Sequence, residues 1–271
     1  MPHQPARPIL VTGGGRGLGR AIAARLAQDG AAVGLVARTE TELLETAREI
    51  RSNGGQAETY VADVRDPGQL VDVAKAFADH AGGIEGLVVA AGRLHAVGPL
   101  ADLNLDVWRD DFDTAVLGAV HAIRAACPYL NASRRGSIVV LVGPGHAAEF
   151  AHASAYAAAQ AALVRLVETL AVEFADGPLI HALNPGIVPT KLIKHILDSP
   201  EGRRFLPRVG DVFAEGKEVD AQPAANLAAW LFEQRPTALN GRVVSALATP
   251  EILESRLDRI LSENLGVLRL R

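Results

Sequence analysis

A glycine-rich turn near the N-terminus is the first feature of the sequence with a chemical meaning. The run Thr12-Gly13-Gly14-Gly15-Arg16-Gly17-Leu18-Gly19 follows a short apolar stretch and opens a segment with apolar residues at helical spacing. Glycines allow a tight turn and close approach of the backbone to a ligand, and a helix N-terminus offers free N–H groups and positive potential to a phosphate. The spacing Gly13-x-x-x-Gly17-x-Gly19 therefore predicts a dinucleotide-binding turn that holds a pyrophosphate.

Tyr156 is the residue best suited to move a proton. It begins the alanine-rich run Tyr-Ala-Ala-Ala-Gln, so that Gln160 lies one helical turn further along. A neutral phenol can donate a proton to a developing alkoxide, but its ordinary pKa of about 10 makes it a poor base at neutral pH. His146 and His152, in the preceding loop, could polarise a substrate oxygen or act as general acids. A surface or purely structural role is the alternative for both, and His95 is a further candidate.

The elements that must position these residues are short β-rich runs, which alternate along the chain with longer helical stretches. The runs predicted as strands are 9–11, 33–37, 60–62, 87–89, 138–142, 179–183 and 242–245. The stretches predicted as helices are 18–28, 40–52, 67–80, 108–130, 155–174 and 222–232. Strands that are apolar on both sides and joined by helices predict a Rossmann-type, doubly wound α/β fold. We expect a parallel sheet of about seven strands with helices on both faces.

The whole chain, 1–271, is predicted to be a single dinucleotide-binding domain with a core over about 8–246 and a helical extension over about 249–271. Segment 192–219 is less periodic, and it is either a loop that covers a ligand or a plain surface excursion. The extension is predicted as a helix that begins with Thr249-Pro250-Glu251 and stops at Gly266. Its apolar stripe either packs on its own domain or contacts another subunit.

Composition narrows the classes of function. The 271 residues are 49% apolar and 21% charged, with a formal net charge of −4 and no cluster of Lys and Arg, which argues against a nucleic-acid partner. Cys127 is the single cysteine, so an internal disulfide is impossible, and we expect no metal site. No signal peptide and no apolar run long enough to cross a membrane are evident, so we expect a cytoplasmic protein without a membrane partner.

Several motifs taken in order resemble those of the short-chain dehydrogenase/reductase family, over roughly residues 8–246. They are the glycine turn, Asp63-Val64 after the third strand, Ala91-Gly92 after the fourth, Tyr156, and Asn184-Pro185-Gly186 with Thr190 after the sixth. The resemblance implies an oxidoreductase that transfers a hydride between a nicotinamide dinucleotide and a carbonyl compound. It implies that Gly13, Arg16, Gly17, Leu18 and Gly19 bind phosphate, that Asp63 and Val64 flank the adenine, that Ala91 and Gly92 line the cofactor, and that Pro185, Gly186, Val188 and Thr190 hold the nicotinamide end.

The sequence departs from the family pattern at the catalytic residues, apart from Tyr156. Gln160 stands where the family has a lysine, Gly143 where it has a serine and Ala115 where it has an asparagine. Gln160 can still bind ribose hydroxyls but cannot lower the Tyr156 pKa, which favours carbonyl reduction over alcohol oxidation. Two alternatives stay open: an inactive dinucleotide-binding protein or partner subunit, and a non-redox enzyme such as a cyclase or dehydratase.

Charge indicates which dinucleotide binds. Proteins that select NAD usually carry an acid near the end of the second strand, where this sequence has Ala37 followed by Arg38. Arg38 together with Arg16 suits a 2′-phosphate, so we expect NADP(H) to be preferred over NAD(H).

The surroundings of the site suggest a substrate and an assembly. Ile187, Val188, Leu192 and Ile193 would favour a small hydrophobic carbonyl substrate, unless they are core residues. The family resemblance implies a homodimer or homotetramer, with the long helices around Ala115 and Ala161 as the interface. Small side chains that would let those helices approach are Ala155, Ala157, Ala158, Ala159, Ala161 and Ala162.

Overall fold

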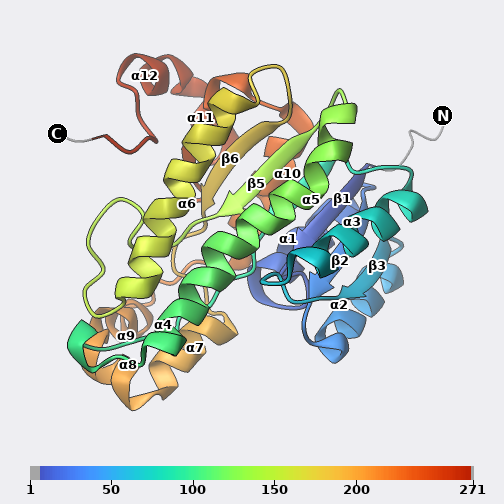
Figure 1. The fold of residues 1–271 in the computed structure, drawn as a ribbon. Helices are drawn as coiled ribbons and strands as arrows, with labels where there is room; N and C mark the ends of the chain where they lie inside the picture. The colour runs from blue at the N-terminus through green and yellow to red at the C-terminus, as the bar shows by residue number, and fades with distance from the viewer. Residues whose placement is uncertain (1–6, 270–271) are drawn as a thin grey trace.

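Seven parallel strands form one sheet at the centre of the protein in a computed structural model, which describes residues 7–269 (Figure 1). The strands are β1 (Pro8–Thr12), β2 (Ala32–Ala37), β3 (Gln56–Val61), β4 (Gly86–Val89), β5 (Ser137–Leu141), β6 (Leu179–Asn184) and β7 (Val243–Ser245). Their spatial order is β3-β2-β1-β4-β5-β6-β7. The predicted Rossmann-type fold is confirmed. The order reverses between β1 and β4, and ligands of such sheets bind outside the carboxyl ends of the strands at that point.

Helices cover both faces of the sheet, because successive residues of each strand point to opposite sides. The long helices are α1 (Gly17–Gln28), α2 (Glu40–Ser52), α3 (Pro67–Ala81), α5 (Gly118–Ala132), α6 (Ser154–Glu173) and α10 (Ala221–Gln234), and the shorter α4 (Leu105–Phe112) precedes α5. Leu10 of β1 belongs to one core cluster, with α3, α5 and α6, whereas Ile9 and Val11 belong to the other, with α1, α2 and α10. Short helical turns are η1 (Leu100–Asp102), η2 (Asp113–Leu117) and η3 (Thr237–Leu239).

The helix predicted over 108–130 is in fact interrupted. It begins at Leu105 because the Asn104 side chain accepts hydrogen bonds from the amides of Asp106 and Val107, at 2.8 and 3.3 Å. The π-helical turn η2 then separates α4 from α5. Turns of this kind are frequent at functional sites, and two residues of η2, Thr114 and Ala115, line the pocket described below.

Segment 192–219, predicted as a loop, instead contains three short helices that lie beside α4 in Figure 1: α7 (Lys191–Asp198), α8 (Pro200–Phe205) and α9 (Pro207–Ala214). Thr190 and Ser199 cap the first two, accepting hydrogen bonds from Ile193 N (3.4 Å) and Gly202 N (3.0 Å). Prolines begin α8 and α9. Ile196, Leu206 and Val209 form part of a third apolar cluster with Leu94, Val97 and Ala153, so this segment is packed against the rest of the chain.

The C-terminal extension contains two short helices, α11 (Pro250–Ser255) and α12 (Leu257–Ser262), where one helix up to Gly266 was predicted. Leu253 is buried, and Leu257 and Ile260 pack against the core cluster of α1, α2 and α10. This contact supports the alternative in which the stripe packs on its own chain. Ile252 and Leu261 stay exposed.

Helix α6 corrects the expectation about membrane spans. By length and composition alone it could cross a membrane, although 39% of its apolar window is buried within the protein. A core helix passes the same test, and α6 contributes Leu163, Val164 and Val167 to the core.

Candidate functional site

A pocket of about 530 Å³ opens at the carboxyl ends of the central strands. The glycine turn after β1, the loops after β4 and β5, and the start of α7 all contribute to it. Every residue that the sequence analysis assigns to cofactor binding lines this pocket, and so do Tyr156 and Gln160. Residues more than 170 positions apart along the chain, such as Gly13 and Thr190, thus share one cavity.

The glycine turn has the geometry of a phosphate cradle. Gly13 has φ +69°, and a β-carbon there would lie 2.8 Å from the Ala90 carbonyl carbon. Gly17 has φ +54° and faces Thr190, 3.3 Å from where its β-carbon would be. Helix α1 begins at Gly17, and Arg16 at its N-cap makes no side-chain cap hydrogen bond. Bare backbone at a helix N-terminus fits the phosphates of a dinucleotide.

The two arginines expected at a 2′-phosphate both have acidic neighbours, which the sequence analysis did not anticipate. Arg38 Nη1 lies 3.7 Å from Asp63 Oδ2, and Arg16 Nη1 lies 3.4 Å from Glu42 Oε1. Asp63 is held mainly by Arg65, whose hydrogen bonds keep the pKa of that carboxyl below its ordinary value. About half of each arginine side chain, Arg16 and Arg38, remains exposed.

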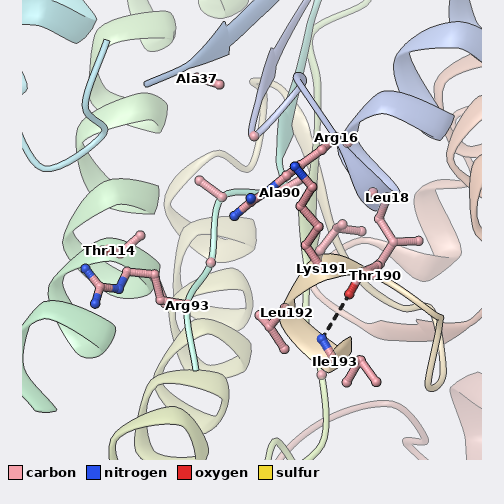
Figure 2. A pocket seen from close by; sticks show the side chains of 18 of the residues that line it. Arg16, Leu18, Ala37, Ala90, Arg93, Thr114, Thr190, Lys191, Leu192 and Ile193 are labelled. Atoms are coloured by element: carbon pink, nitrogen blue, oxygen red, sulfur yellow. Dashed lines mark hydrogen bonds between the residues drawn. The ribbon is translucent and has the colours of Figure 1, made fainter. Parts of the chain in front are cut away.

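Lys191 and Glu42 line the pocket but were missed from the sequence. Lys191, the first residue of α7, places its Nζ 2.5 Å from Glu42 Oε1. Figure 2 shows Thr190 and Lys191 beside Arg16 and Leu18 of the glycine turn, so that the start of α7 lies next to that turn. No helix was predicted at Lys191, and the following segment 192–219 was predicted as a loop, so nothing in the sequence indicated where this ammonium group lies.

Tyr156 and Gln160 converge on Gly143. Burial raises the pKa of the Tyr156 phenol to about 12. A β-carbon at position 143 would overlap the Tyr156 hydroxyl oxygen, so this glycine makes room for the phenol. Gln160 is buried, and its Oε1 accepts a 2.7 Å hydrogen bond from the Gly143 amide. The amide nitrogen of Gln160 remains free to donate to a ribose hydroxyl.

Of the three histidines predicted to act near the substrate, His95 lines the pocket, whereas His146 and His152 are not among the lining residues. His146 Nδ1 lies 2.8 Å from the Gly143 carbonyl oxygen. The ring centroids of His152 and Phe205 are 5.0 Å apart. His95 and His195 do line the pocket, with ring centroids 4.5 Å apart. Burial is the largest cause of a lowered pKa at His95.

The loop that carries His95 is anchored by a buried carboxylate. Asp111 of α4 accepts hydrogen bonds from the backbone amides of His95 and Ala96, at 2.6 and 2.8 Å, and from Arg93 Nε at 3.2 Å. Figure 2 places Arg93 on the side of the pocket near Thr114, away from Arg16. Asp111 thus fixes the backbone that positions His95. Among residues 7–269, no three His, Cys, Asp or Glu side chains are grouped as a metal ion would need.

Comparisons with known proteins agree with this geometry. A profile described as short chain dehydrogenase matches residues 7–201. An uncharacterized oxidoreductase of Staphylococcus epidermidis is 29% identical over 241 residues, which cover 89% of this chain and 96% of the relative. A short chain dehydrogenase of Monascus ruber is 30% identical over 266 residues, covering 95% and 86% of the two chains.

Solved structures are similar over most of their length. A variant of actinorhodin polyketide ketoreductase, solved with NADPH, superposes with a TM-score of 0.80 at 27% identity and covers 90% of this chain and 97% of its own. Levodione reductase superposes with a TM-score of 0.81 at 26% identity and covers 88% and 95%.

Proposed function

The chain belongs to the short-chain dehydrogenase family and is an oxidoreductase of that type, and from this premise we propose that it is an NADP(H)-dependent reductase acting on the carbonyl of a small hydrophobic substrate. The observation that carries the proposal is that Tyr156 lines the same pocket as the glycine turn. When bound there, NADPH would supply a hydride from its nicotinamide ring. The similarity to a ketoreductase solved with NADPH supports this choice.

Tyr156 donates the proton that the reduced carbonyl oxygen takes up. Its pKa of about 12 keeps the phenol protonated throughout the physiological range, so it is available as an acid and not as a base. In this proposal the family's catalytic set is degenerate, because Gly143, Gln160 and Ala115 replace its serine, lysine and asparagine. The lack of a lysine beside Tyr156 favours reduction over oxidation.

Arg16 and Arg38 support the preference for NADP(H). Both guanidinium groups line the pocket, and the end of β2 offers Ala37 instead of a carboxylate that would repel a 2′-phosphate. The proposal further assigns the phosphates to the glycine turn, the adenine to Asp63 and Val64, and the nicotinamide end to the loop after β6.

The other end of the pocket suits an apolar substrate. Ile187, Leu192 and Ile193 line it, and His95 is the imidazole placed to hydrogen-bond a polar substrate atom. Among the three candidate histidines, we therefore assign this role to His95 and not to His146 or His152. We propose a small-molecule substrate and a cytoplasmic location, without a nucleic-acid or membrane partner.

The direct test follows NADPH absorbance in the presence of apolar ketones and quinones. Tyr156→Phe should reduce the rate at least about 100-fold, because a positioned general acid contributes that much or more. Tyr129→Phe, on α5 and outside the pocket, is the matched control. Because Tyr156 stays protonated, its ionisation should not lower the rate of reduction between pH 6 and 9. Fast alcohol oxidation near pH 7 that Tyr156→Phe abolishes would contradict the proposed direction.

A further inference from the structure

Glu42 forms a bridge between two segments of the pocket wall that are distant in sequence. It lies in the first turn of α2, and its side chain is 16% exposed. Its Oε1 is 2.5 Å from Lys191 Nζ, 149 residues away on α7, and 3.4 Å from Arg16 Nη1 in the glycine turn. One carboxylate therefore holds two cations, and all three side chains line the pocket.

The local sequence suggests a different role for this glutamate. Thr39-x-x-Glu42 matches a capping box, in which the threonine side chain bonds into the helix and the glutamate reaches back to the N-cap. In the structure Thr39 makes no side-chain cap hydrogen bond. The carboxylate of Glu42 is directed at Arg16 and Lys191 instead. Glu42 is also packed on the glycine turn, since a β-carbon at Gly15 would lie 3.1 Å from its own.

We propose that Glu42 competes with a phosphate group of the cofactor for Arg16 and Lys191, and that Lys191 is a third cation of the phosphate site. Guanidinium and ammonium groups that hold a carboxylate are the groups that hold phosphate in proteins. A phosphate must displace Glu42 to engage them, so Glu42 limits how strongly a phosphorylated dinucleotide binds. This inference rests on the proposed dinucleotide cofactor and adds a residue that tunes its affinity.

Two neighbouring residues provide matched controls. Glu40 lies in the same turn of α2 and is exposed, and it does not line the pocket. Glu40→Gln therefore removes the same charge from the same helix end as Glu42→Gln. Lys194 lies one turn beyond Lys191 on α7, is exposed and does not line the pocket, so Lys194→Gln is the control for Lys191→Gln.

The experiment measures binding instead of turnover, by titrating each purified variant with NADPH and following the fluorescence of its reduced nicotinamide. Glu42→Gln should tighten NADPH binding about threefold to tenfold, the range expected when one or two partly exposed ion pairs no longer have to be broken. Lys191→Gln should weaken binding by a similar factor. Glu40→Gln and Lys194→Gln should stay within about twofold of the unaltered protein.

Two cofactor fragments identify which phosphate is involved. If Glu42 competes with the 2′-phosphate, Glu42→Gln will increase the affinity for adenosine 2′,5′-bisphosphate more than the affinity for ADP. If Glu42 competes with the pyrophosphate, the affinity for ADP will increase at least as much as the affinity for the bisphosphate. Either pattern supports the competition.

Other results overturn it. The role given to the bridge is contradicted if Glu42→Gln binds NADPH no more tightly than the unaltered protein, or if Glu40→Gln gains as much affinity. It is also contradicted if Lys191→Gln loses no affinity. Each of these results leaves the proposed function intact. If the unaltered protein binds neither NADPH nor NADH, the proposed function fails and this inference fails with it. Thermal unfolding of each variant establishes that it is folded.

Discussion

At the scale of single residues, Gly143 and Gln160 form one arrangement around Tyr156. The phenol hydroxyl fills the space that a β-carbon at position 143 would take, and Gln160 accepts the hydrogen bond of the Gly143 amide. That amide needs an acceptor, which a lysine at position 160 could not provide because its ammonium group only donates. Gln160→Lys would therefore leave the Gly143 amide without its acceptor, whereas any side chain added at position 143 would meet the Tyr156 hydroxyl.

Gly143→Ala tests this arrangement. The backbone at position 143 lies outside the left-handed region, so the main obstacle to alanine is the Tyr156 hydroxyl oxygen, with Tyr156 Cζ 3.2 Å from the added β-carbon. We expect a loss of about 1–3 kcal/mol in the free energy of unfolding, the usual cost of overpacking, measured by urea denaturation. In the Gly143→Ala, Tyr156→Phe double variant the hydroxyl is gone, so part of the loss should be recovered.

Gly92→Ala is the control for that experiment. Gly92 also lines the pocket, but a β-carbon there meets no atom within 4 Å, so its free energy of unfolding should not decrease. Equal losses in Gly143→Ala with and without the Tyr156 hydroxyl would show that the phenol does not occupy this space.

At the scale of helices and strands, the sequence predicts the fold better than it predicts the contacts of the site. Most of the strands were predictable because they are short apolar runs buried on both faces, as β1 and β5 are, and the glycine turn was predictable because its spacing is local. The Glu42–Lys191 pair was not predictable, since 149 residues separate its members and α7 was not recognised as a helix. His195, which is also on α7, was missed for the same reason.

Strand β6 makes the stability of the fold sensitive to acid through His181. This side chain is fully buried, its Nδ1 has no hydrogen-bond partner within residues 7–269, and its Nε2 is 3.5 Å from the Pro236 carbonyl oxygen. Burial lowers the pKa of His181 from 6.5 to about 4. Because the unfolded chain binds this proton at a higher pH, the free energy of unfolding should fall as pH drops from 6.5 towards 4. A pKa difference of about 2.5 corresponds to at most about 3 kcal/mol.

His181→Leu should remove this part of the pH dependence. We would measure urea denaturation at pH 7, 5.5 and 4.5 for the variant, with the exposed His80→Gln on α3 as control. The slope of stability against pH should flatten in His181→Leu and remain in His80→Gln. An unchanged slope in His181→Leu would mean that another group binds the proton on unfolding.

At the scale of the whole molecule, α6 joins the site to the outer surface. One face of this helix carries Tyr156 and Gln160 into the pocket, and another leaves Ala158 and Val172 exposed. Leu117, between α4 and α5, is a further exposed apolar residue. We propose that α5 and α6 form the interface of a homodimer or homotetramer, because side chains as small as alanine allow helices to approach closely. Subunit contact would then support the helix that carries Tyr156.

Ala158→Glu tests the assembly. Because Ala158 is exposed in the single chain, a glutamate there should leave the fold of one subunit intact but put a charge into a helix interface. Light scattering coupled to size-exclusion chromatography should therefore report a mass reduced towards 28.5 kDa, the mass of one chain. Ala76→Glu makes the same change at an exposed position of α3, far along the chain from α6, and should leave the mass unaltered. If the unaltered protein is a monomer, there is no such interface. If the Ala158→Glu variant keeps its full assembly, the interface lies elsewhere. If the interface does support α6, the monomeric variant should also bind NADPH more weakly than the Ala76→Glu control.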